Sequence, residues 1–171
     1  EKINSIGNQI VGVSAGGNLS AIVDSTGAVY VFGDNSKEQI EPFKYNYDEF
    51  GQKILPALNT YISEPEKVSS INNAVKVECL QSGFVILKAD GSVAKTNKYA
   101  KEQNIVLENV ASSNIVDISA TNENIVLLDK DLNTYTFGDN KNGQAGIGTT
   151  SDKVSLQKVN MIEGKTYFNI G

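Results

Sequence analysis

Thr26-Gly27-Ala28-Val29-Tyr30-Val31-Phe32-Gly33-Asp34-Asn35 is the stretch of sequence that decides the fold. It opens with a Thr-Gly turn signal, continues as an alternation of aromatic and aliphatic residues, and closes on Gly-Asp-Asn. A turn followed by such a run is typical of the second arm of a β-hairpin. Because successive side chains of a strand point to opposite faces, we expect the rings of Tyr30 and Phe32 to share one face.

The same pattern returns further along the chain. Residues 10–40 placed over 115–145 without gaps give 11 identical pairs in 31 positions, which is far above chance. A third copy lies between them at an offset of 64, and it keeps Val75, Val77 and Ile86 but has lost the Phe-Gly-Asp-Asn ending. The sequence therefore predicts one propeller segment spanning 1–171, with repeat units at about 10–68, 74–110 and 115–159 and an insertion at 41–64.

Each copy predicts four short strands. The first three are expected near 10–13, 21–23 and 28–32 and at the corresponding places of the later copies, and the fourth near 66–68, 109–110 and 158–159, with a further one at Lys2-Ile3. The predicted fold class is all-β: three four-stranded antiparallel blades of a β-propeller, either a partial ring or a segment of a larger one. We expect equivalent core positions for Ile22, Ile86 and Leu127, and buried rings for Tyr30, Phe32, Tyr135 and Phe137.

The composition argues against catalysis. The chain of 171 residues has no histidine, so it lacks the commonest general base and metal ligand. Its one cysteine, Cys79, occupies a position where the other copies have alanine, which predicts a small buried residue and no thiolate metal site. We therefore predict no enzyme activity, no catalytic residue, no cofactor and no metal.

Charge and hydropathy restrict the partners. The net charge of −5 and the scattered lysines argue against nucleic acid as the partner, and no apolar run is long enough to span a bilayer. Because the chain starts at Glu1, we expect it to be a processed or excised piece. The Asn- and Lys-rich composition favours a bacterial secreted or cell-surface protein over a nuclear one.

Three polar motifs have structural interpretations that we favour. Asp129, Asp131 and Asn133 have the spacing of a calcium loop, but Thr134 and Asn140 stand where such a loop needs glycine and glutamate, so we expect a hairpin turn. The glycine-rich run 138–148 lacks the lysine of a phosphate loop. Short polar side chains at Asp34, Asn35, Asp139 and Asn140 are expected to bond turn backbone, and Gln39, Gln103 and Gln144 to donate between blades.

The repeat resembles that of the regulator of chromosome condensation family. The resemblance rests on Ser14-Ala15-Gly16, on residues 26–35 and on the ending Gly138 to Gly146, although Leu19 replaces the family's usual histidine and Phe32 and Phe137 replace its tryptophan. It implies the blade fold and an interaction role. Nothing in the sequence resembles the projecting hairpin and basic tail of the nuclear exchange factor, so the resemblance does not carry exchange activity over.

The insertion 41–64 is the candidate binding segment, because it is extra to the repeat and rich in aromatics. Clustered tyrosine and phenylalanine are typical of protein contact surfaces, and the alternative is that the rings pack the loop onto its own blade. The residues predicted to contact a protein partner are Phe43, Tyr45, Tyr47, Phe50 and Tyr61.

We interpret the chain as a non-catalytic protein-interaction scaffold. The alternatives are a guanine-nucleotide exchange factor for a small GTPase and a surface module that binds carbohydrate. Because three blades do not close a ring of the usual size, we also expect either a larger propeller or self-association through open blade edges.

Overall fold

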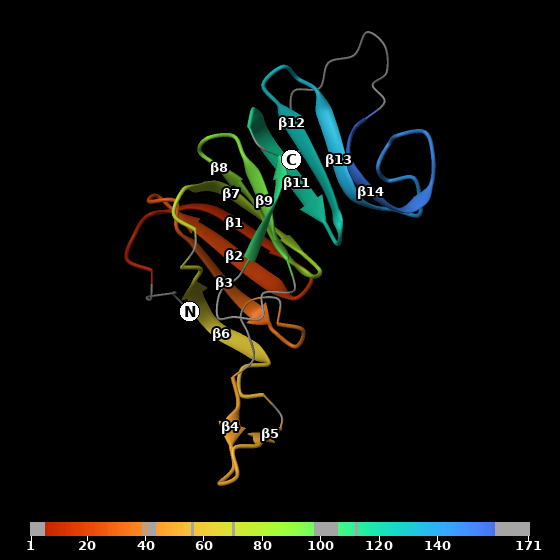
Figure 1. Cartoon of the computed structure of the whole chain (residues 1–171). Coiled ribbons are helices and arrows are strands. Elements are labelled where there is room, and N and C mark those ends of the chain that lie inside the picture. The colour runs from red at the N-terminus through yellow and green to blue at the C-terminus, as the bar shows by residue number, and fades with distance from the viewer. Residues whose placement is uncertain are drawn as a thin grey trace.

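The computed structural model describes residues 6–38, 40, 44–55, 57–69, 71–97, 106–111 and 113–159. Within these ranges every regular element is a strand, and the strands form three four-stranded antiparallel sheets and one two-stranded sheet. Figure 1 shows the three large sheets following one another as the blades of an open propeller segment. The predicted fold class is therefore confirmed, and the ring is open.

The three large sheets have the same plan, in which each strand pairs with the next strand of its own sheet; in the first sheet β4 and β5 intervene between the third and fourth strands. The first blade contains β1 (Ile10–Gly16), β2 (Leu19–Asp24), β3 (Val29–Asp34) and β6 (Tyr61–Lys67). The second contains β7 (Ala74–Leu80), β8 (Gly83–Lys88), β9 (Val93–Asn97) and β10 (Val106–Ala111). The third contains β11 (Ile115–Thr121), β12 (Asn124–Asp129), β13 (Thr134–Asn140) and β14 (Ser151–Lys158). The small sheet pairs β4 (Asn46–Tyr47) with β5 (Lys53–Ile54).

Two apolar cores hold the blades together, one at each interface between neighbouring blades. The first core joins side chains of the first and second blades, among them Val23, Val31, Phe84 and Ile86. The second core joins Leu87 and Val93 to the aliphatic residues of β11 and β12. The middle blade thus buries both faces, which explains why its second strand is a continuous apolar run, Phe84 to Leu87.

The equivalent core positions predicted from the repeat are confirmed. Ile22, Ile86 and Leu127 are all at least nine-tenths buried, and each lies opposite the same residue of the preceding strand: Val13, Val77 and Ile118. The predicted fourth strands also form, as β6, β10 and β14, while Lys2-Ile3 lies outside the described residues.

The prediction that the four repeated aromatic rings are buried was wrong. Tyr30, Phe32, Tyr135 and Phe137 are only partly buried. The tyrosines end in hydroxyls that bond to a carboxylate, and the ring of Phe137 lies beneath the Lys95 ammonium at 5.0 Å. Phe32, Tyr135 and Phe137 pack against the margins of the two cores, where water reaches them, and aliphatic residues fill the centres of the cores.

Each innermost strand is bent at the same place. The pairing of β1 with β2 shifts between Ile10 and Gly12, and the same shift recurs in the second and third blades. The extra residue at the bulge is a valine in all three: Val11, Val75 and Val116. A bulge leaves its extra residue unpaired and turns it away from the ladder, and these three valines are each about half exposed.

Candidate protein-interaction surface

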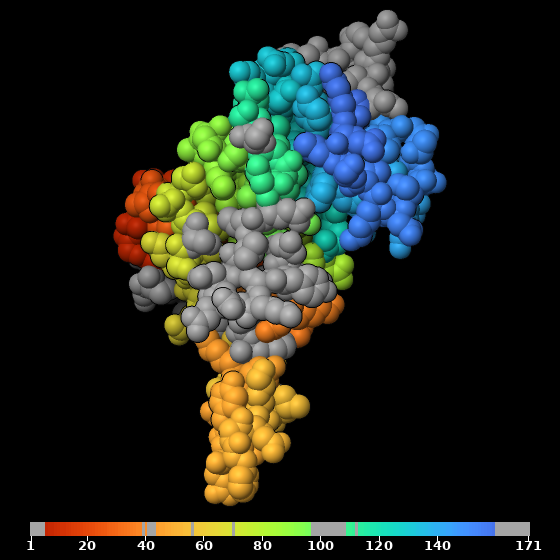
Figure 2. Space-filling model, in the orientation of Figure 1, coloured from red at the N-terminus to blue at the C-terminus, as the bar shows by residue number. Residues whose placement is uncertain are grey.

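The insertion folds into a hairpin that leaves the body of the molecule. β4 and β5 pair at Asn46–Ile54 and Tyr47–Lys53, and Figure 1 shows them projecting beyond β6. The same segment, orange to yellow in Figure 2, is surrounded by solvent on the face shown. Sequence reasoning found no projecting hairpin here, because β4 and β5 are two residues each and carry no repeat pattern.

Local chemistry explains why residues 46–54 turn back on themselves. The Asp48 carboxylate accepts hydrogen bonds from the backbone N–H groups of Phe50 at 2.9 Å and Gln52 at 2.8 Å. Gly51 takes a φ of 76°, which a residue with a side chain rarely adopts. Aspartate and glycine at these places specify a tight turn without support from a core.

The base of the hairpin is anchored to the first blade by two buried asparagines. Asn35 accepts from the Ile40 N–H at 2.9 Å and donates to the Asn59 carbonyl at 2.8 Å. Asn59 in turn accepts from the Lys44 N–H at 2.7 Å, and the Leu58 N–H donates to the Lys44 carbonyl at 2.8 Å. Both ends of the insertion are therefore fixed, so the projection starts from a rigid base.

The hairpin and its flanks expose large apolar side chains. We call this set the hairpin surface; its members, with the exposed fraction of each, are Tyr47 58%, Phe50 79%, Ile54 48%, Leu55 74%, Leu58 61% and Tyr61 72%. Strand pairing places Tyr47 and Ile54 on opposite faces of the hairpin, so the exposed apolar side chains are distributed around the projection. Exposed apolar groups gathered on one segment favour a place where another molecule binds. A hollow of about 300 Å³ at the foot of the hairpin is lined by Leu58 and Tyr61 together with Glu64 and Glu66.

The structure separates the residues that sequence reasoning proposed for partner binding. Tyr47, Phe50 and Tyr61 are exposed. Tyr45 is partly buried and its ring lies 4.5 Å from the Lys53 ammonium, so it also stabilises the hairpin. Phe43 lies outside the described residues.

Sequence reasoning missed the aliphatic half of the hairpin surface. The sequence has an apolar run that includes Ile54, Leu55 and Leu58 and that fits no strand or helix pattern. That run was the available signal for exposed aliphatic side chains. The prediction considered only aromatic residues and so did not include these aliphatic ones.

The calcium-like segment is a hairpin turn, as predicted. The Asp129 carboxylate accepts from the backbone N–H groups of Asp131 and Asn133 at 2.9 and 2.8 Å. It also accepts from the Asn133 amide at 2.9 Å and the Tyr135 hydroxyl at 3.2 Å. Burial alone would raise the pKa of Asp129, but these hydrogen bonds outweigh it and hold the pKa below its usual value. Across the described ranges no three Cys, Asp or Glu side chains gather as metal ligands would.

Asp34, Asn35 and Asn140 bond turn backbone with their side chains, as predicted. Asn140 accepts from the Ala145 N–H at 3.0 Å and donates to the Thr149 carbonyl at 2.9 Å, which repeats the contacts of Asn35. The prediction for Gln144 was wrong, because its side chain is exposed and accepts from the Asn142 N–H in its own loop. Gln39 and Gln103 lie outside the described residues.

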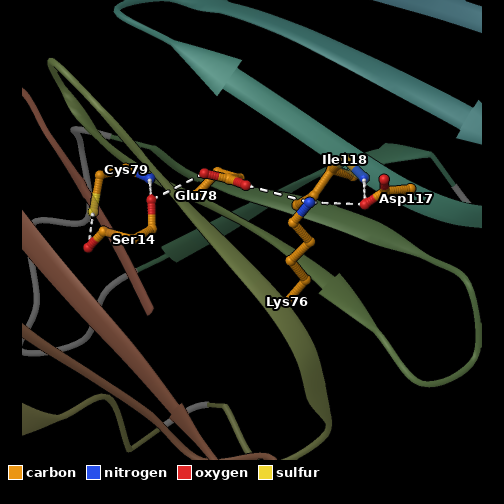
Figure 3. Close-up of polar contacts among 6 residues, drawn as sticks. All are labelled: Ser14, Lys76, Glu78, Cys79, Asp117 and Ile118. Carbon is orange, nitrogen blue, oxygen red and sulfur yellow. Dashed lines mark hydrogen bonds and ion pairs between the residues drawn. The ribbon is translucent and has the colours of Figure 1, made fainter. Parts of the chain in front are cut away.

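A polar chain crosses the three innermost strands (Figure 3). Ser14 donates to Glu78 at 2.9 Å, and the Lys76 ammonium lies 3.4 Å from Glu78 and 2.8 Å from Asp117. Burial would lower the pKa of Lys76, but its acidic neighbours, Asp117 foremost, outweigh it and raise that pKa. The groups neutralise one another across the blade interfaces.

Cys79 lies beside this chain and is buried, as the repeat predicted. Its backbone N–H donates to the Ser14 hydroxyl at 3.0 Å, and its Sγ lies 3.6 Å from the Ser14 carbonyl. Burial raises the pKa of the thiol to about 11, so the nucleophilic thiolate is scarce at neutral pH.

Comparison with known proteins agrees with the geometry. The family model of the regulator of chromosome condensation (RCC1) repeat matches residues 10–39, and no curated protein sequence matches the chain significantly. Human WBSCR16 superposes with a TM-score of 0.68 at 16% identity, covering 91% of this chain and 42% of that one. Yeast RCC1 (Prp20) bound to Kap60 gives 0.64 at 15% identity, covering 92% and 38%.

A structure of Prp20p from Saccharomyces cerevisiae, described with its binding to Gsp1p and histones, gives a TM-score of 0.63 at 18% identity, covering 91% of this chain and 37% of that one. The chain therefore spans about two fifths of the length of these propellers. At identities this low, the structural similarity shows the blade fold alone. No helix within the described residues is long and apolar enough to cross a membrane.

Proposed function

We propose that this chain, whose residues 10–39 match the RCC1 repeat model, is a non-catalytic protein-interaction scaffold that binds a protein partner through its hairpin surface. The observation that carries the proposal is the exposure of six large apolar side chains on one anchored projection. Blade interiors are fixed by packing between repeats, so an insertion is the part of such a scaffold that can acquire specificity.

The composition of the hairpin surface supports a protein partner. Tyr47, Phe50 and Tyr61 each present a large ring with few rotatable bonds, so little conformational entropy is lost when a partner immobilises them. The aliphatic side chains beside them extend the area that a partner can remove from water. Binding energy in protein interfaces is concentrated in a few such anchors.

The test is a pair of substitutions at the two most prominent rings of β4 and its turn. A Tyr47→Ser/Phe50→Ser variant keeps the Asp48 turn and the asparagine anchors, so its unfolding free energy should stay within about 0.5 kcal/mol of the wild type. Its affinity for a partner captured quantitatively by the wild-type chain should fall by at least about 30-fold, as the loss of a hot spot does. Val75→Ser, at an equally exposed valine on the second blade, is the matched control and should bind normally.

Two results would contradict the proposal. One is a sharply lower melting temperature of the double variant with unchanged binding by the folded fraction, which would make the rings local packing. The other is an equal loss of binding in Val75→Ser, which would place the contact on the blades.

Nucleotide exchange on a small GTPase is the second candidate. Two observations favour it: a hairpin does project from the first blade, and the Prp20p structure is described with binding to Gsp1p. We rank it below the scaffold, because the identity to Prp20p is only 18% and the described blades come from a chain with a net charge of −5. Nucleotide release from a panel of small GTPases should stay at the uncatalysed rate, and clear acceleration would reverse the ranking.

A further inference from the structure

A glycine-rich loop, residues 141–150, joins β13 to β14 and is drawn in blue beside β14 in Figure 1. It stands where the first blade has its insertion, since both follow the Gly-Asp-Asn ending of a third strand. Asn140 fixes the loop from inside, because its side chain accepts from the Ala145 N–H at 3.0 Å and donates to the Thr149 carbonyl at 2.9 Å. Asn140 and Ala145 are 0% and 1% exposed, so the first of these contacts is shielded from water.

The loop contains the one Asn-Gly pair of the sequence, Asn142-Gly143. Asn142 is exposed, and the structure gives its side-chain amide no hydrogen bond within the described ranges. Gly143 has a φ of 74° and no Cβ to shield its backbone nitrogen. The electrophilic carbon of an asparagine side chain and an unhindered backbone nitrogen are therefore neighbours on an exposed loop.

We propose that Asn142-Gly143 is a site of non-enzymatic deamidation, and that the isoaspartate formed there releases the loop from Asn140. The inference does not involve the hairpin surface. It concerns a covalent change that needs only water and the residues of the loop.

The reaction has two steps. The backbone nitrogen of Gly143 gives its proton to base and attacks Cγ of Asn142, so that a new N–C bond forms, the bond to the amide nitrogen breaks, and that nitrogen leaves as ammonia with a proton from water. Water then opens the resulting succinimide ring. Addition at the former side-chain carbonyl gives aspartate, and addition at the main-chain carbonyl gives isoaspartate. The net change is the gain of one water and the loss of one ammonia, with no oxidation or reduction.

The fold should slow this reaction but not prevent it. The Gly143 N–H donates to the Asn140 carbonyl at 3.1 Å, and the Asn142 N–H donates to Oε1 of Gln144 at 2.9 Å. The Gly143 nitrogen must leave this turn before it can attack, so the reaction proceeds from a locally opened loop. We therefore expect deamidation in the folded protein, at a lower rate than in the unfolded chain.

The first copy has the same turn without the reactive pair. The Glu38 N–H donates to the Asn35 carbonyl at 2.9 Å, and Glu38 has a φ of 56°. Lys37 and Glu38 stand at the places of Asn142 and Gly143. The turn therefore does not require Asn-Gly, and substitutions at the pair can test the chemistry without removing the turn.

Asp90-Gly91 provides an internal contrast. An aspartate before glycine can form the same ring, but the Asp90 carboxylate accepts from the Ser92 N–H at 2.9 Å and the Ser92 hydroxyl at 2.6 Å. These hydrogen bonds lower the pKa of Asp90 and keep it ionised. An ionised carboxylate is a poor electrophile, so we expect no product at Asp90.

Isoaspartate at 142 should disturb the anchor because it places one more carbon in the main chain between residues 142 and 143. With a longer chain the loop cannot close over Asn140 in the same geometry. The Ala145 N–H then loses its acceptor and a buried amide loses its partners. Aspartate at 142 adds the same charge on a main chain of normal length, so it should leave the anchor intact.

Incubation of the folded protein in mildly alkaline buffer tests the proposal. Anion exchange should resolve an acidic species that accumulates with time, and peptide mass mapping with isoaspartate-specific methylation should place it at residue 142. Conversion should be severalfold faster in urea. Asn46 and Asn122 are also exposed but precede Tyr47 and Glu123, so they should stay unmodified.

Two variants isolate the chemistry. Asn142→Gln keeps a side-chain amide but would have to close a larger ring, so it should form no acidic species in the same period. In Gly143→Ala the nearest atom to the new Cβ is 3.8 Å away, and Glu38 shows that a side chain is tolerated in this conformation. This variant should therefore fold, and the added Cβ should slow deamidation at least about tenfold by hindering the attack.

Hydrogen exchange of the Ala145 N–H tests the release of the loop. Exchange should be slow in the wild type and in Asn142→Asp, and at least severalfold faster in the purified isoaspartyl protein. Equal exchange in all three would overturn the release. A folded wild type that forms no acidic species while the unfolded chain is converted would overturn the site, as would modification at Asn46 or Asn122 in its place or an unchanged rate in Asn142→Gln.

Discussion

Tyr30 donates its hydroxyl hydrogen to Oδ2 of Asp24 at 3.2 Å. The relationship returns in the third blade, where Tyr135 donates to Asp129 at the same distance. In each case a buried carboxylate closes a β-hairpin and is held in place by the strand that follows it. Burial raises the pKa of both tyrosines, and the bond to aspartate raises it further.

The two carboxylates should make the protein sensitive to acid. Burial would raise the pKa of Asp24, but hydrogen bonds from Thr26, Asn8 and Ala28 outweigh it, so the folded pKa lies well below the unfolded value. The unfolded chain then binds the proton more readily, so the stabilisation is present above about pH 4 and is lost as the pH falls through the folded pKa. Urea unfolding between about pH 6 and pH 2 should show this decline, and Asp24→Asn should flatten it. An unchanged slope in that variant would refute the assignment.

The glycine of the Gly-Asp-Asn ending should resist substitution. Gly138 has a φ of +114°, and a Cβ at this place would collide with the carbonyl oxygen of Glu123. Gly138→Ala should therefore lower the unfolding free energy by at least about 2 kcal/mol. Gly7→Ala is the control, since no atom lies within 4 Å of its Cβ position, and it should be near neutral. Equal chemical denaturation curves for the two variants would contradict the prediction.

Two phenylalanines should differ in their energetic contribution. Phe84 is 1% exposed in the core between the first and second blades, and Phe84→Ala should cost about 3–5 kcal/mol. Phe137 is only partly buried beneath Lys95, so Phe137→Ala should cost clearly less, about 1–3 kcal/mol. Denaturant unfolding of both variants decides the order, and a larger loss at Phe137 would mean that the interface margin matters more than its centre.

Cys79 should report when the first interface between blades opens. Its thiol is buried, with a pKa of about 11, so a thiol reagent at pH 8 should react only through transient opening. Phe84 lies opposite Cys79 in the ladder, and Phe84→Ala should accelerate the reaction severalfold. Immediate reaction of the native wild type would show that the interface does not protect the thiol.

Repetition made most of the fold predictable. The first and last copies, once aligned, identified the strands and the turns. The middle copy could then be placed although it has lost the Phe-Gly-Asp-Asn ending. The burial of Cys79 followed from Ala15 and Ala120 at the equivalent positions. Single positions could not show that water reaches the margins of an interface between blades, and so the burial of Phe32 and Phe137 was overestimated.

The candidate site was less predictable for a physical reason. A hairpin that does not contribute to a core needs no regular alternation of apolar residues. The only sequence signal for β4 and β5 was therefore the turn formed by Asp48 and Gly51. Aromatic content identified Tyr47 and Phe50.

The polar chain across the innermost strands fixes the order of the repeats. Lys76 reaches forward to Asp117, and Glu78 reaches back to Ser14. The position of Asp117 is occupied by Gly12 in the first copy, whereas the position of Ser14 is again serine in the third, Ser119. If the outer copies changed places, Glu78 would keep a serine but Lys76 would face a glycine without an acceptor. The middle copy, which has lost most of the family signature, therefore distinguishes its two neighbours. A version of this chain with the outer copies exchanged would lose the ion pair between Lys76 and the following blade.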